Sequence, residues 1–272
     1  MRFDPEFDDT RWTGEWLTIP FVQIPPGRYM GGYVVRREMV AIASICDRPY
    51  QLLRPLDCRG LYDPAGLLWM SDTPQERLMM HNNALASGGR ILVGGLGLGL
   101  YPQYVASRAQ SITVVERSPD VAAIVWPVIE GALAGTQLQL ILADIETFLG
   151  QAPTTQYDTI FLDTWEALDA TRLPHVNRLR DLAYRHLSPT GQVLLWGYRW
   201  MVRLFEVACL DLLSQPPIDR AAWLARRTHD HPAAAALLTP VQEQFASQDV
   251  TDLDRALAWC CQYVTTLVYP RT

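Results

Sequence analysis

The sequence contains no lysine, and all 23 of its basic side chains are arginine. Enzymes that form a Schiff base on a lysine amine, including those that attach pyridoxal phosphate, are therefore excluded, as is a P-loop with its phosphate-binding lysine. Basic residues are also fewer than the 29 acidic ones, which gives a formal charge of -6. Because nucleic-acid binding needs a basic surface, we expect no nucleic-acid partner.

Cysteine is scarce, with five residues that form no CxxC pair and have no histidine at zinc-ligand spacing. This pattern predicts reduced thiols and no metal site. Long apolar runs are missing too, since none approaches the length that spans a bilayer, and the first residues are acidic and form no apolar leader. From these absences we expect a cytoplasmic protein without a membrane partner.

Apolar residues are plentiful, at 49% of 272, which is enough for a full core. Residues 1–72 hold short β-favouring runs between proline and glycine turns and predict a small antiparallel sheet. Residues 73–215 alternate such runs with helical patterns, which predicts a doubly wound (Rossmann-like), mostly parallel α/β sheet. Residues 216–272 predict a helical cap broken at its prolines. The β-favouring runs of the first region are 16–24, 33–35, 39–43, 50–53 and 66–70.

Capping residues mark where two helices of the central region begin. Asp72 or Thr73 is expected to cap a helix that opens at Pro74. Ser118 is expected to cap another that opens at Pro119. Proline suits the first turn of each helix because the N–H that it lacks has no partner there.

The central motif is an apolar run at 90–93 that breaks into alternating glycines at 94–99 and resumes as a helix. It predicts a strand, a tight turn and a helix start, where a nucleotide can lie against bare backbone at the positive end of the helix. Glycine turns of this kind also occur for packing alone. The motif therefore needs support from the residues that follow it.

Three carboxylates come directly after further apolar runs, namely Glu116, Asp144 and Asp163. In parallel α/β sheets ligands bind outside the carboxyl ends of the strands, so we expect these side chains to surround one crevice. Glu116 stands roughly 20 residues after the glycines, where a doubly wound fold places the acceptor of ribose hydroxyls. The other interpretation of Glu116 and Asp144 is an ordinary strand-end or capping carboxylate.

The glycine turn together with these three carboxylates resembles the successive binding motifs of class I S-adenosylmethionine-dependent methyltransferases. Their order and framing, with Glu76 on a helix before the glycine strand, look most like the spermidine synthase-like branch of that fold. The resemblance covers residues 66 to 200, approximately. It implies S-adenosylmethionine as the cofactor and a small molecule as the acceptor. It is also compatible with a homodimer through the N-terminal sheet.

The resemblance also implies roles for individual residues. Glu116 would hold both ribose hydroxyls, Asp144 would meet the adenine amino group, and Asp163 would lie nearest the transferring carbon. These roles suit the chemistry, because a carboxylate accepts hydroxyl or amine protons and is favoured beside a sulfonium. The glycines under the methionine part of the cofactor would be Gly95, Gly97 and Gly99.

Two departures separate the chain from aminopropyltransferases. Leu98 stands where those enzymes carry an aspartate in the glycine turn, and residues 163–166 read Asp-Thr-Trp-Glu where they carry an Asp-Ser-Ser-Asp type sequence. We therefore predict methyl transfer to a small-molecule acceptor. One alternative is an aminopropyl transferase, because Asp163, Glu166 and Asp169 would suit a cationic amine. The other is a protein that keeps the fold without catalysis.

Methyl transfer needs a base only to remove a proton from the acceptor. Asp163 is our first candidate for this base, and Glu166 and His175 are second choices. The other interpretation of His175 is a surface residue at a helix start. Four aromatic residues after the fourth and fifth strands either wall an acceptor pocket or serve packing, namely Trp165, Trp196, Tyr198 and Trp200.

Overall fold

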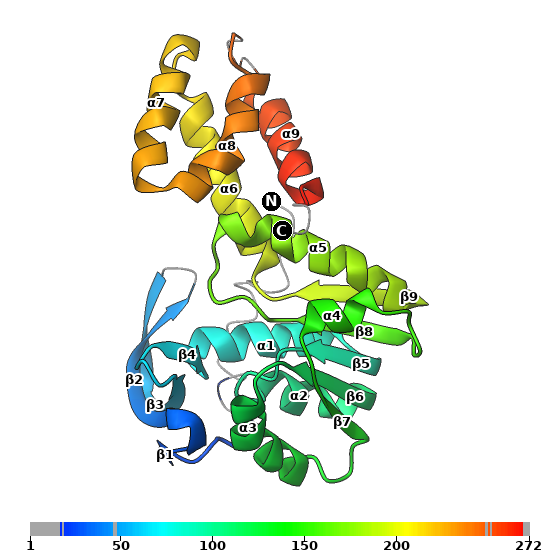
Figure 1. Cartoon of the computed structure of the whole chain (residues 1–272). Helices are drawn as coiled ribbons and strands as arrows, with labels where there is room; N and C mark the ends of the chain where they lie inside the picture. Colours follow the sequence, from blue (N-terminus) through cyan, green and yellow to red (C-terminus); the bar gives the residue numbers. More distant parts are fainter. Residues whose placement is uncertain (1–16, 18, 46–47, 248–249, 251, 269–272) are drawn as a thin grey trace. The chain divides into compact units, whose positions relative to one another are not determined.

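The structure, a computed structural model, describes residues 17, 19–45, 48–247, 250 and 252–268, and Figure 1 labels its helices and strands. The chain forms two compact units. The first runs to Glu166 and includes Leu182–Trp196, and the second comprises Ala167–Asp181 and the chain from Gly197 onward. The domain boundaries expected from the sequence, after residues 72 and 215, stay a prediction.

A five-stranded sheet lies at the centre of the first unit, and all its neighbouring strands are parallel. Its strands, in the spatial order β7-β6-β5-β8-β9, are β7 (Leu138–Leu142), β6 (Ala109–Glu116), β5 (Gly89–Gly94), β8 (Tyr157–Leu162) and β9 (Leu187–Leu195). The chain moves outward from β5 to β7 and then returns to β8, so the strand order reverses between β5 and β8. The predicted doubly wound sheet is confirmed, and such a reversal is where this architecture binds ligands.

Four helices accompany this sheet, with two short 3-10 turns. They are α1 (Pro74–Ala86), α2 (Leu100–Val105), η4 (Ala106–Arg108), α3 (Pro119–Ala132), α4 (Ile145–Gly150) and η6 (Tyr184–His186). α2 packs against both α1 and α3, and α3 and α4 both contact β6. The inner strands β5 and β8 are buried along most of their length, as expected of strands that are covered on both faces.

The capping predictions differ in outcome. Ser118 caps α3, because its side chain accepts a hydrogen bond from a first-turn N–H at 3.2 Å. Thr73 occupies the N-cap position of α1, but its side chain caps no N–H among the described residues. Asp72 accepts from the N–H of Arg59 at 2.6 Å and pairs with Arg77 at 3.4 Å. Asp72 is buried, so its charge needs partners, and Arg59 and Arg77 supply them instead of the helix.

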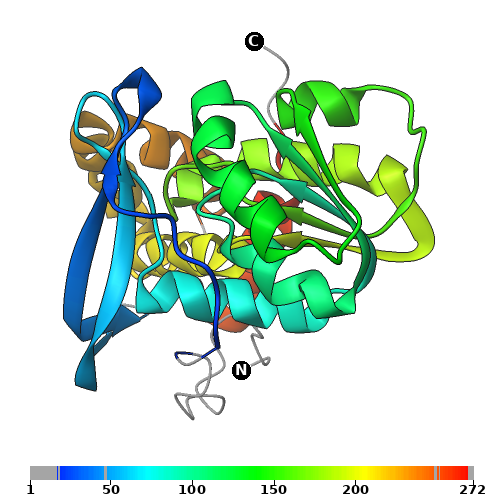
Figure 2. The same ribbon diagram turned by 90° about the horizontal axis from the view of Figure 1, so that it is seen from below.

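The N-terminal region forms a second, four-stranded sheet that is antiparallel throughout, as predicted. Its elements are β1 (Gly27–Arg28), the 3-10 turn η3 (Met30–Gly32), β2 (Val34–Ile45), β3 (Arg48–Tyr62) and β4 (Leu68–Ser71). Figure 2 shows β2 and β3 as a long pair of strands, coloured blue. The short runs predicted within residues 33–53 lie in these two strands, because cross-strand pairing continues through the polar residues between them.

The β-favouring run at 16–24 is an exception. Trp16 lies outside the described residues, and the described part of the run forms no strand. The N–H of Val22 donates to the side-chain oxygen of Gln103 at 2.7 Å, and the Gln103 amide donates back to the Val22 carbonyl at 3.1 Å. This side chain from α2 therefore replaces a neighbouring strand as the hydrogen-bond partner.

The second unit is helical, which confirms the predicted helical C-terminal region. It contains η5 (Ala170–Arg172), most of α5 (Leu173–Ala183), α6 (Tyr198–Leu213), α7 (Pro217–Asp230), α8 (Pro232–Gln244) and α9 (Leu253–Thr266). Pro217 and Pro232 open helices, and Pro240 lies within α8, where we expected a break. Within the described ranges, none of the helices combines the length and the apolar character that crossing a bilayer requires.

Arg220 of α7 holds the start of this bundle together. It is only 2% exposed. Its guanidinium donates to the carbonyl oxygens of Gln215, Leu213 and Phe245 at 3.0, 3.1 and 2.6 Å. The arginine thus satisfies carbonyls from the α6–α7 loop and from the end of α8. This gives a structural reason for a buried charge in a region without a predicted site.

Candidate functional site

The residues that follow the strands are tied together at the carboxyl edge of the parallel sheet. In each case the N–H of a residue past one strand donates to a carbonyl near the end of its neighbour. The bonds run from Gly95 to Val115, Ala143 to Glu116, Asp163 to Gly94 and Trp196 to Leu162, at 2.9 to 3.0 Å. The glycine turn and the segments that carry the three predicted carboxylates therefore start from one edge of the sheet.

The three predicted glycines have positive φ, at 91° for Gly95, 57° for Gly97 and 76° for Gly99. A Cβ on Gly95 would overlap the carbonyl oxygen of Asp163, and one on Gly99 would overlap the side chain of Ile129. These two glycines allow close packing. Around a Cβ built on Gly97, by contrast, no atom of the described residues lies within 4 Å. Gly97 therefore presents bare backbone to open space.

Glu116 is 7% exposed and connects the glycine turn to the start of α3. One of its carboxylate oxygens accepts from the N–H of Leu96 at 2.9 Å, and the other accepts from the N–H of Ser118 at 2.8 Å. Asp144 is exposed and caps α4 by accepting from the N–H of Thr147 at 2.8 Å. Both side chains thus have structural partners, and neither lines the pocket described next. Their cofactor contacts stay a prediction.

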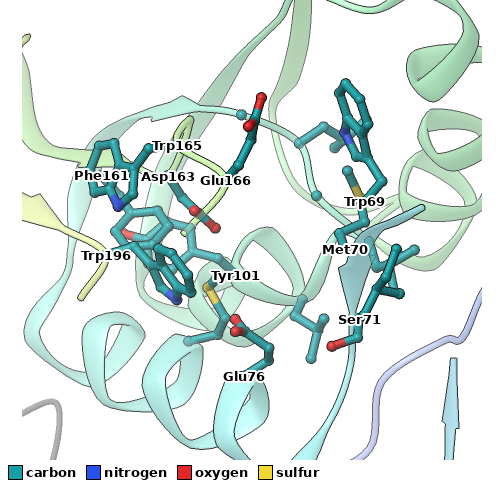
Figure 3. Close-up of a pocket in the computed structure, with 17 residues that line it drawn as sticks. Trp69, Met70, Ser71, Glu76, Tyr101, Phe161, Asp163, Trp165, Glu166 and Trp196 are labelled. Carbon is teal, nitrogen blue, oxygen red and sulfur yellow. The ribbon is translucent and has the colours of Figure 1, made fainter. Parts of the chain in front are cut away.

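A pocket of about 210 Å³ opens above the glycine turn, and all its walls belong to the first unit. Figure 3 shows Asp163, Trp165 and Trp196 on one side of it and Trp69, Met70 and Ser71 of β4 on the other. Gly95 and Gly97 line it as well, together with Glu76 from α1 and Tyr101 from α2. The pocket therefore lies beyond the ends of β5, β8 and β9, next to the reversal in strand order.

The charge of this pocket is of one sign. It is lined by the carboxylates of Glu76, Asp163 and Glu166, and among the described residues that line it none is basic. Burial raises the pKa of the Asp163 carboxyl from 3.8 to about 7. A cationic ligand would be attracted to this pocket, and Asp163 could exchange a proton with it near neutral pH.

Two tryptophans on one wall carry unused hydrogen-bond donors. Trp165 and Trp196 are 7% and 8% exposed, and their rings lie 6.5 Å apart at 43°. Both line the pocket, yet the indole N–H of each is buried and has no acceptor among the described residues. The sequence allowed these residues as pocket walls or as packing, and it held no signal for the missing acceptors.

Some residues of the pocket were not predicted from the sequence, and some predicted residues lie outside the pocket. Glu76 figured in the resemblance without a site role, and Trp69 and Ser71 of β4 were not considered. His175 is exposed and belongs to the second unit, as does Tyr198, whose hydroxyl donates to Asn177 at 2.6 Å. Their catalytic or wall roles stay a prediction. In the described part of the chain, no group of three histidine, cysteine or acidic side chains could hold a metal ion.

Comparison with known proteins gives limited similarity. No protein-family model matches the chain, and no curated protein matches it. Solved structures with partial similarity include the precorrin-8w decarboxylase of Methanobacterium thermoautotrophicum, at 14% identity and a TM-score of 0.35 over 45% of this chain and 62% of that one. They also include CalS10 of Micromonospora echinaspora, an amino pentose methyltransferase solved with S-adenosylmethionine bound, at 19% identity and a TM-score of 0.29 over 42% and 45% of the two chains.

A third structure is the N-methyltransferase NodS of Bradyrhizobium japonicum, at 19% identity and a TM-score of 0.35 over 47% of this chain and 76% of that one. Each of the three matches covers less than half of this chain. In the decarboxylase and CalS10, the matched stretch is also less than two thirds of the other protein. Any statement about function must therefore rest on the geometry of the pocket.

Proposed function

We propose that this chain transfers a methyl group from S-adenosylmethionine to a small-molecule acceptor. The observation that supports the proposal is the pocket itself, where the bare backbone of Gly97 lies in a hollow lined by three carboxylates and without a basic side chain. A sulfonium is a cation, and such surroundings favour its charge. The position beyond a reversal in strand order also agrees with ligand binding in doubly wound sheets.

The residues present fit this cofactor. Gly95 and Gly97 would pass under its methionine part, since both line the pocket with backbone that carries no side chain. Glu116 and Asp144 would take the ribose hydroxyls and the adenine amino group. In the bonds described above, no carboxylate oxygen of Glu116 or Asp144 accepts more than one backbone N–H. Each oxygen can accept a second hydrogen bond, which a ligand could donate. When bound, the cofactor supplies a methyl carbon that is activated by a positively charged sulfur.

Asp163 would act on the acceptor. A carboxyl with a pKa near 7 is divided between its two forms at neutral pH, so it can take a proton from the acceptor and later release it. Glu166, on the same loop, and His175 are the other candidates. Positioning of the two reactants would supply much of the acceleration, because the methyl carbon is already activated.

A second candidate is aminopropyl transfer from the decarboxylated form of the cofactor. The observation that favours it is that Glu76 and Glu166 line the pocket together with Asp163, because a pocket lined by several carboxylates attracts a cationic amine. Leu98 and Trp165 weigh against it, because an apolar and a bulky side chain stand where that chemistry uses small or acidic ones. Methyl transfer therefore remains our first proposal.

Calorimetric titration of the full chain with S-adenosylmethionine, its decarboxylated form and S-adenosylhomocysteine distinguishes these functions. We expect the first and third compounds to bind. Selective binding of the decarboxylated form would favour aminopropyl transfer. If none of the three binds, the enzyme proposed here does not exist, and the chain keeps the fold without this catalysis.

A matched pair of glycine variants tests where the donor lies. Gly97 and Gly66 both have positive φ, at 57° and 83°, and neither has a described atom within 4 Å of an added Cβ. Only Gly97 lines the pocket. Gly97→Ala and Gly66→Ala should each cost about 1 kcal/mol of folding free energy through backbone strain. Gly97→Ala alone should weaken S-adenosylhomocysteine binding, by about tenfold or more. Equal affinities in the two variants would contradict this placement.

A further inference from the structure

β4 brings exposed apolar side chains into the pocket. Its four residues, Leu68–Ser71, all line the pocket, and Figure 3 shows Trp69 on the side opposite Asp163. Leu68 is 56% exposed and Trp69 is 39% exposed, whereas the two tryptophans of the opposite wall are buried. Apolar surface that stays exposed inside a pocket is a surface on which a ligand gains free energy by excluding water. This wall therefore suits an apolar part of the acceptor.

The ring of Trp69 is held in place by its neighbours. Tyr33 of β2 packs edge-on against it, with ring centroids 6.4 Å apart at 86°, and Tyr33 is itself buried. The guanidinium carbon of Arg117 lies 6.0 Å from the centroid of the Trp69 ring. The exposed part of the ring is thus available without a change of conformation. Aromatic rings pack favourably offset or edge-on with other rings, so this surface favours an aromatic body over an aliphatic one.

The opposite wall determines the charge of the acceptor. Asp163 lines this wall, and burial is the cause of the raised pKa of its carboxyl. None of the described residues that line the pocket is basic. An ammonium beside Asp163 would favour the ionised form of the carboxyl, and the two charges would attract each other strongly in a site with little water. An anionic group at the same place would be repelled.

We propose that the acceptor of this pocket is an arylalkylamine, whose aromatic ring packs against Trp69 of β4 and whose ammonium lies beside the Asp163 carboxylate. This inference rests on the proposed function, since it names the substrate class of that site. An aliphatic amine lacks the ring that matches the indole, and an aromatic alcohol or acid lacks the positive charge. A ligand with both features uses both walls.

The transfer itself balances with groups already named. The ammonium of the acceptor gives one proton to the Asp163 carboxylate and becomes an uncharged amine. Its nitrogen then forms a bond to the methyl carbon while the carbon–sulfur bond breaks, and the electron pair of that bond stays on sulfur. The product is a methylated ammonium and a neutral thioether, and Asp163 releases its proton to solvent.

Four compounds of similar size test the proposal by calorimetry on the full chain saturated with S-adenosylhomocysteine. They are 2-phenylethylamine, 2-cyclohexylethylamine, 2-phenylethanol and phenylacetate. We expect 2-phenylethylamine to bind at least about threefold more tightly than its cyclohexyl analogue, because a pair of aromatic rings gains more than the burial of its area. It should bind at least about tenfold more tightly than the alcohol and the carboxylate, which lack the charge that Asp163 attracts. Equal binding of the two amines, or of the aromatic amine and the alcohol, would overturn the proposal, as would the absence of binding by all four.

Variants of Trp69 then locate the ring of the acceptor. Trp69→Leu removes the aromatic ring and keeps an apolar side chain, so this variant should bind the two amines within about twofold of each other. Trp69→Phe keeps a ring and should keep the wild-type preference. Trp126→Leu, on α3 and outside the pocket lining, is the matched control and should also keep that preference. If Trp69→Leu retains the wild-type preference, the ring does not lie against β4 and the proposal fails.

Asp163→Asn locates the ammonium. The variant keeps the shape of the side chain and removes its charge, so 2-phenylethylamine should lose its advantage over 2-phenylethanol and bind within about threefold of it. An advantage that stays at the wild-type value would contradict the placement of the ammonium.

The experiment separates this inference from the function on which it rests. S-adenosylhomocysteine is titrated first, and its failure to bind to the wild type would remove the proposed function whatever the four compounds do. If it binds and the wild type does not distinguish the two amines, only the acceptor class is wrong. Loss of S-adenosylhomocysteine binding in Trp69→Leu, with binding kept in Trp126→Leu, would show that the indole meets the donor, and it would overturn the placement of the acceptor ring.

Discussion

At the scale of the residue, Asp163 is the group on which the proposed chemistry of the pocket depends. Its N–H extends the pairing of β8 with β5 at 2.9 Å, so its backbone position is set by the sheet. Its side chain turns into the pocket between two tryptophans and is removed from most of the solvent (Figure 3). The charged form is therefore disfavoured, and the pKa rises to about 7. In the proposed function, this carboxyl at a strand end would accept and release a proton near neutral pH.

Replacing Asp163 with asparagine should lower turnover by about a hundredfold or more, because the base is lost while the shape of the pocket is kept. The affinity for S-adenosylhomocysteine should change by less than about threefold. Steady-state kinetics and calorimetry measure the two effects. Equal losses in both would make Asp163 a binding residue only.

The raised pKa of Asp163 also predicts how the stability and the rate of the wild-type protein depend on pH. The carboxyl keeps its proton up to about pH 7 when folded and loses it near pH 4 when unfolded. Between these values the folded state binds more protons, so this group's contribution to stability falls as the pH rises from 4 to 7. The rate should rise over pH 6–8 as the base is freed. In Asp163→Asn, denaturant titration should show a smaller fall in stability over pH 4–7.

At the scale of the element, Glu116 joins three pieces of the fold. It ends β6, accepts an N–H from the glycine turn after β5 and accepts another at the start of α3. The glycine turn is held in place by this carboxylate as well as by its own backbone. A residue that would bind the ribose is thus also the one that shapes the turn beneath the donor.

Glu116→Ala should weaken S-adenosylhomocysteine binding by about 1 to 3 kcal/mol. It should lower the free energy of unfolding by a similar amount, because the buried N–H of Leu96 and the partly buried N–H of Ser118 lose their acceptor. Calorimetry and chemical denaturation give the two values. Glu130→Ala, an exposed change on α3, is the control and should leave both unchanged. An unaltered dissociation constant in Glu116→Ala would count against a role in donor binding.

Elements with a local signal could be predicted from the sequence. The parallel strands, the glycine turn and the Ser118 cap follow from patterns within a few residues, and each is found. β2 and β3 could not be delimited, because their length depends on pairing between residues distant in the chain. The described part of the run 16–24 has β-favouring residues but forms no strand, because the backbone of Val22 is hydrogen-bonded to the side chain of Gln103 from α2.

The glycine turn of the candidate site could be predicted from the sequence, and the walls of its pocket could be predicted only in part. Glycines and strand-end carboxylates lie in continuous motifs that can be read along the chain. Glu76 and the β4 residues enter the pocket through the packing of α1 and β4, which no spacing encodes. The unpaired indoles of Trp165 and Trp196 become apparent only when every neighbouring acceptor is known.

At the scale of the whole molecule, the chain divides into an α/β unit that contains the pocket and a helical unit. The helical unit has its own polar anchor in Arg220, which satisfies three carbonyls inside it. None of these three carbonyls belongs to a predicted cofactor residue. Loss of Arg220 should therefore act on the stability of the helices that it joins.

Arg220→Met should destabilise the helical unit by about 3 kcal/mol, because buried carbonyls lose a charged donor. Hydrogen exchange should become faster in α6, α7 and α8, while the central strands β5 and β8 serve as the internal reference. Arg226→Met, an exposed change on the same helix, should leave exchange as in the wild type. Unchanged protection of these helices in Arg220→Met would contradict the anchoring role.

The pocket walls come from stretches near residues 70, 97, 163 and 196, which are far apart along the chain. No single segment could hold the proposed donor alone, so affinity for it would arise only after the long-range contacts of the first unit have formed. By mass action, a ligand that binds only this assembled state raises its melting temperature, and a hundredfold excess over the dissociation constant adds about 2.7 kcal/mol. Donor-induced thermal protection is consequently a gauge of whether a given preparation, or a given variant, has completed its folding.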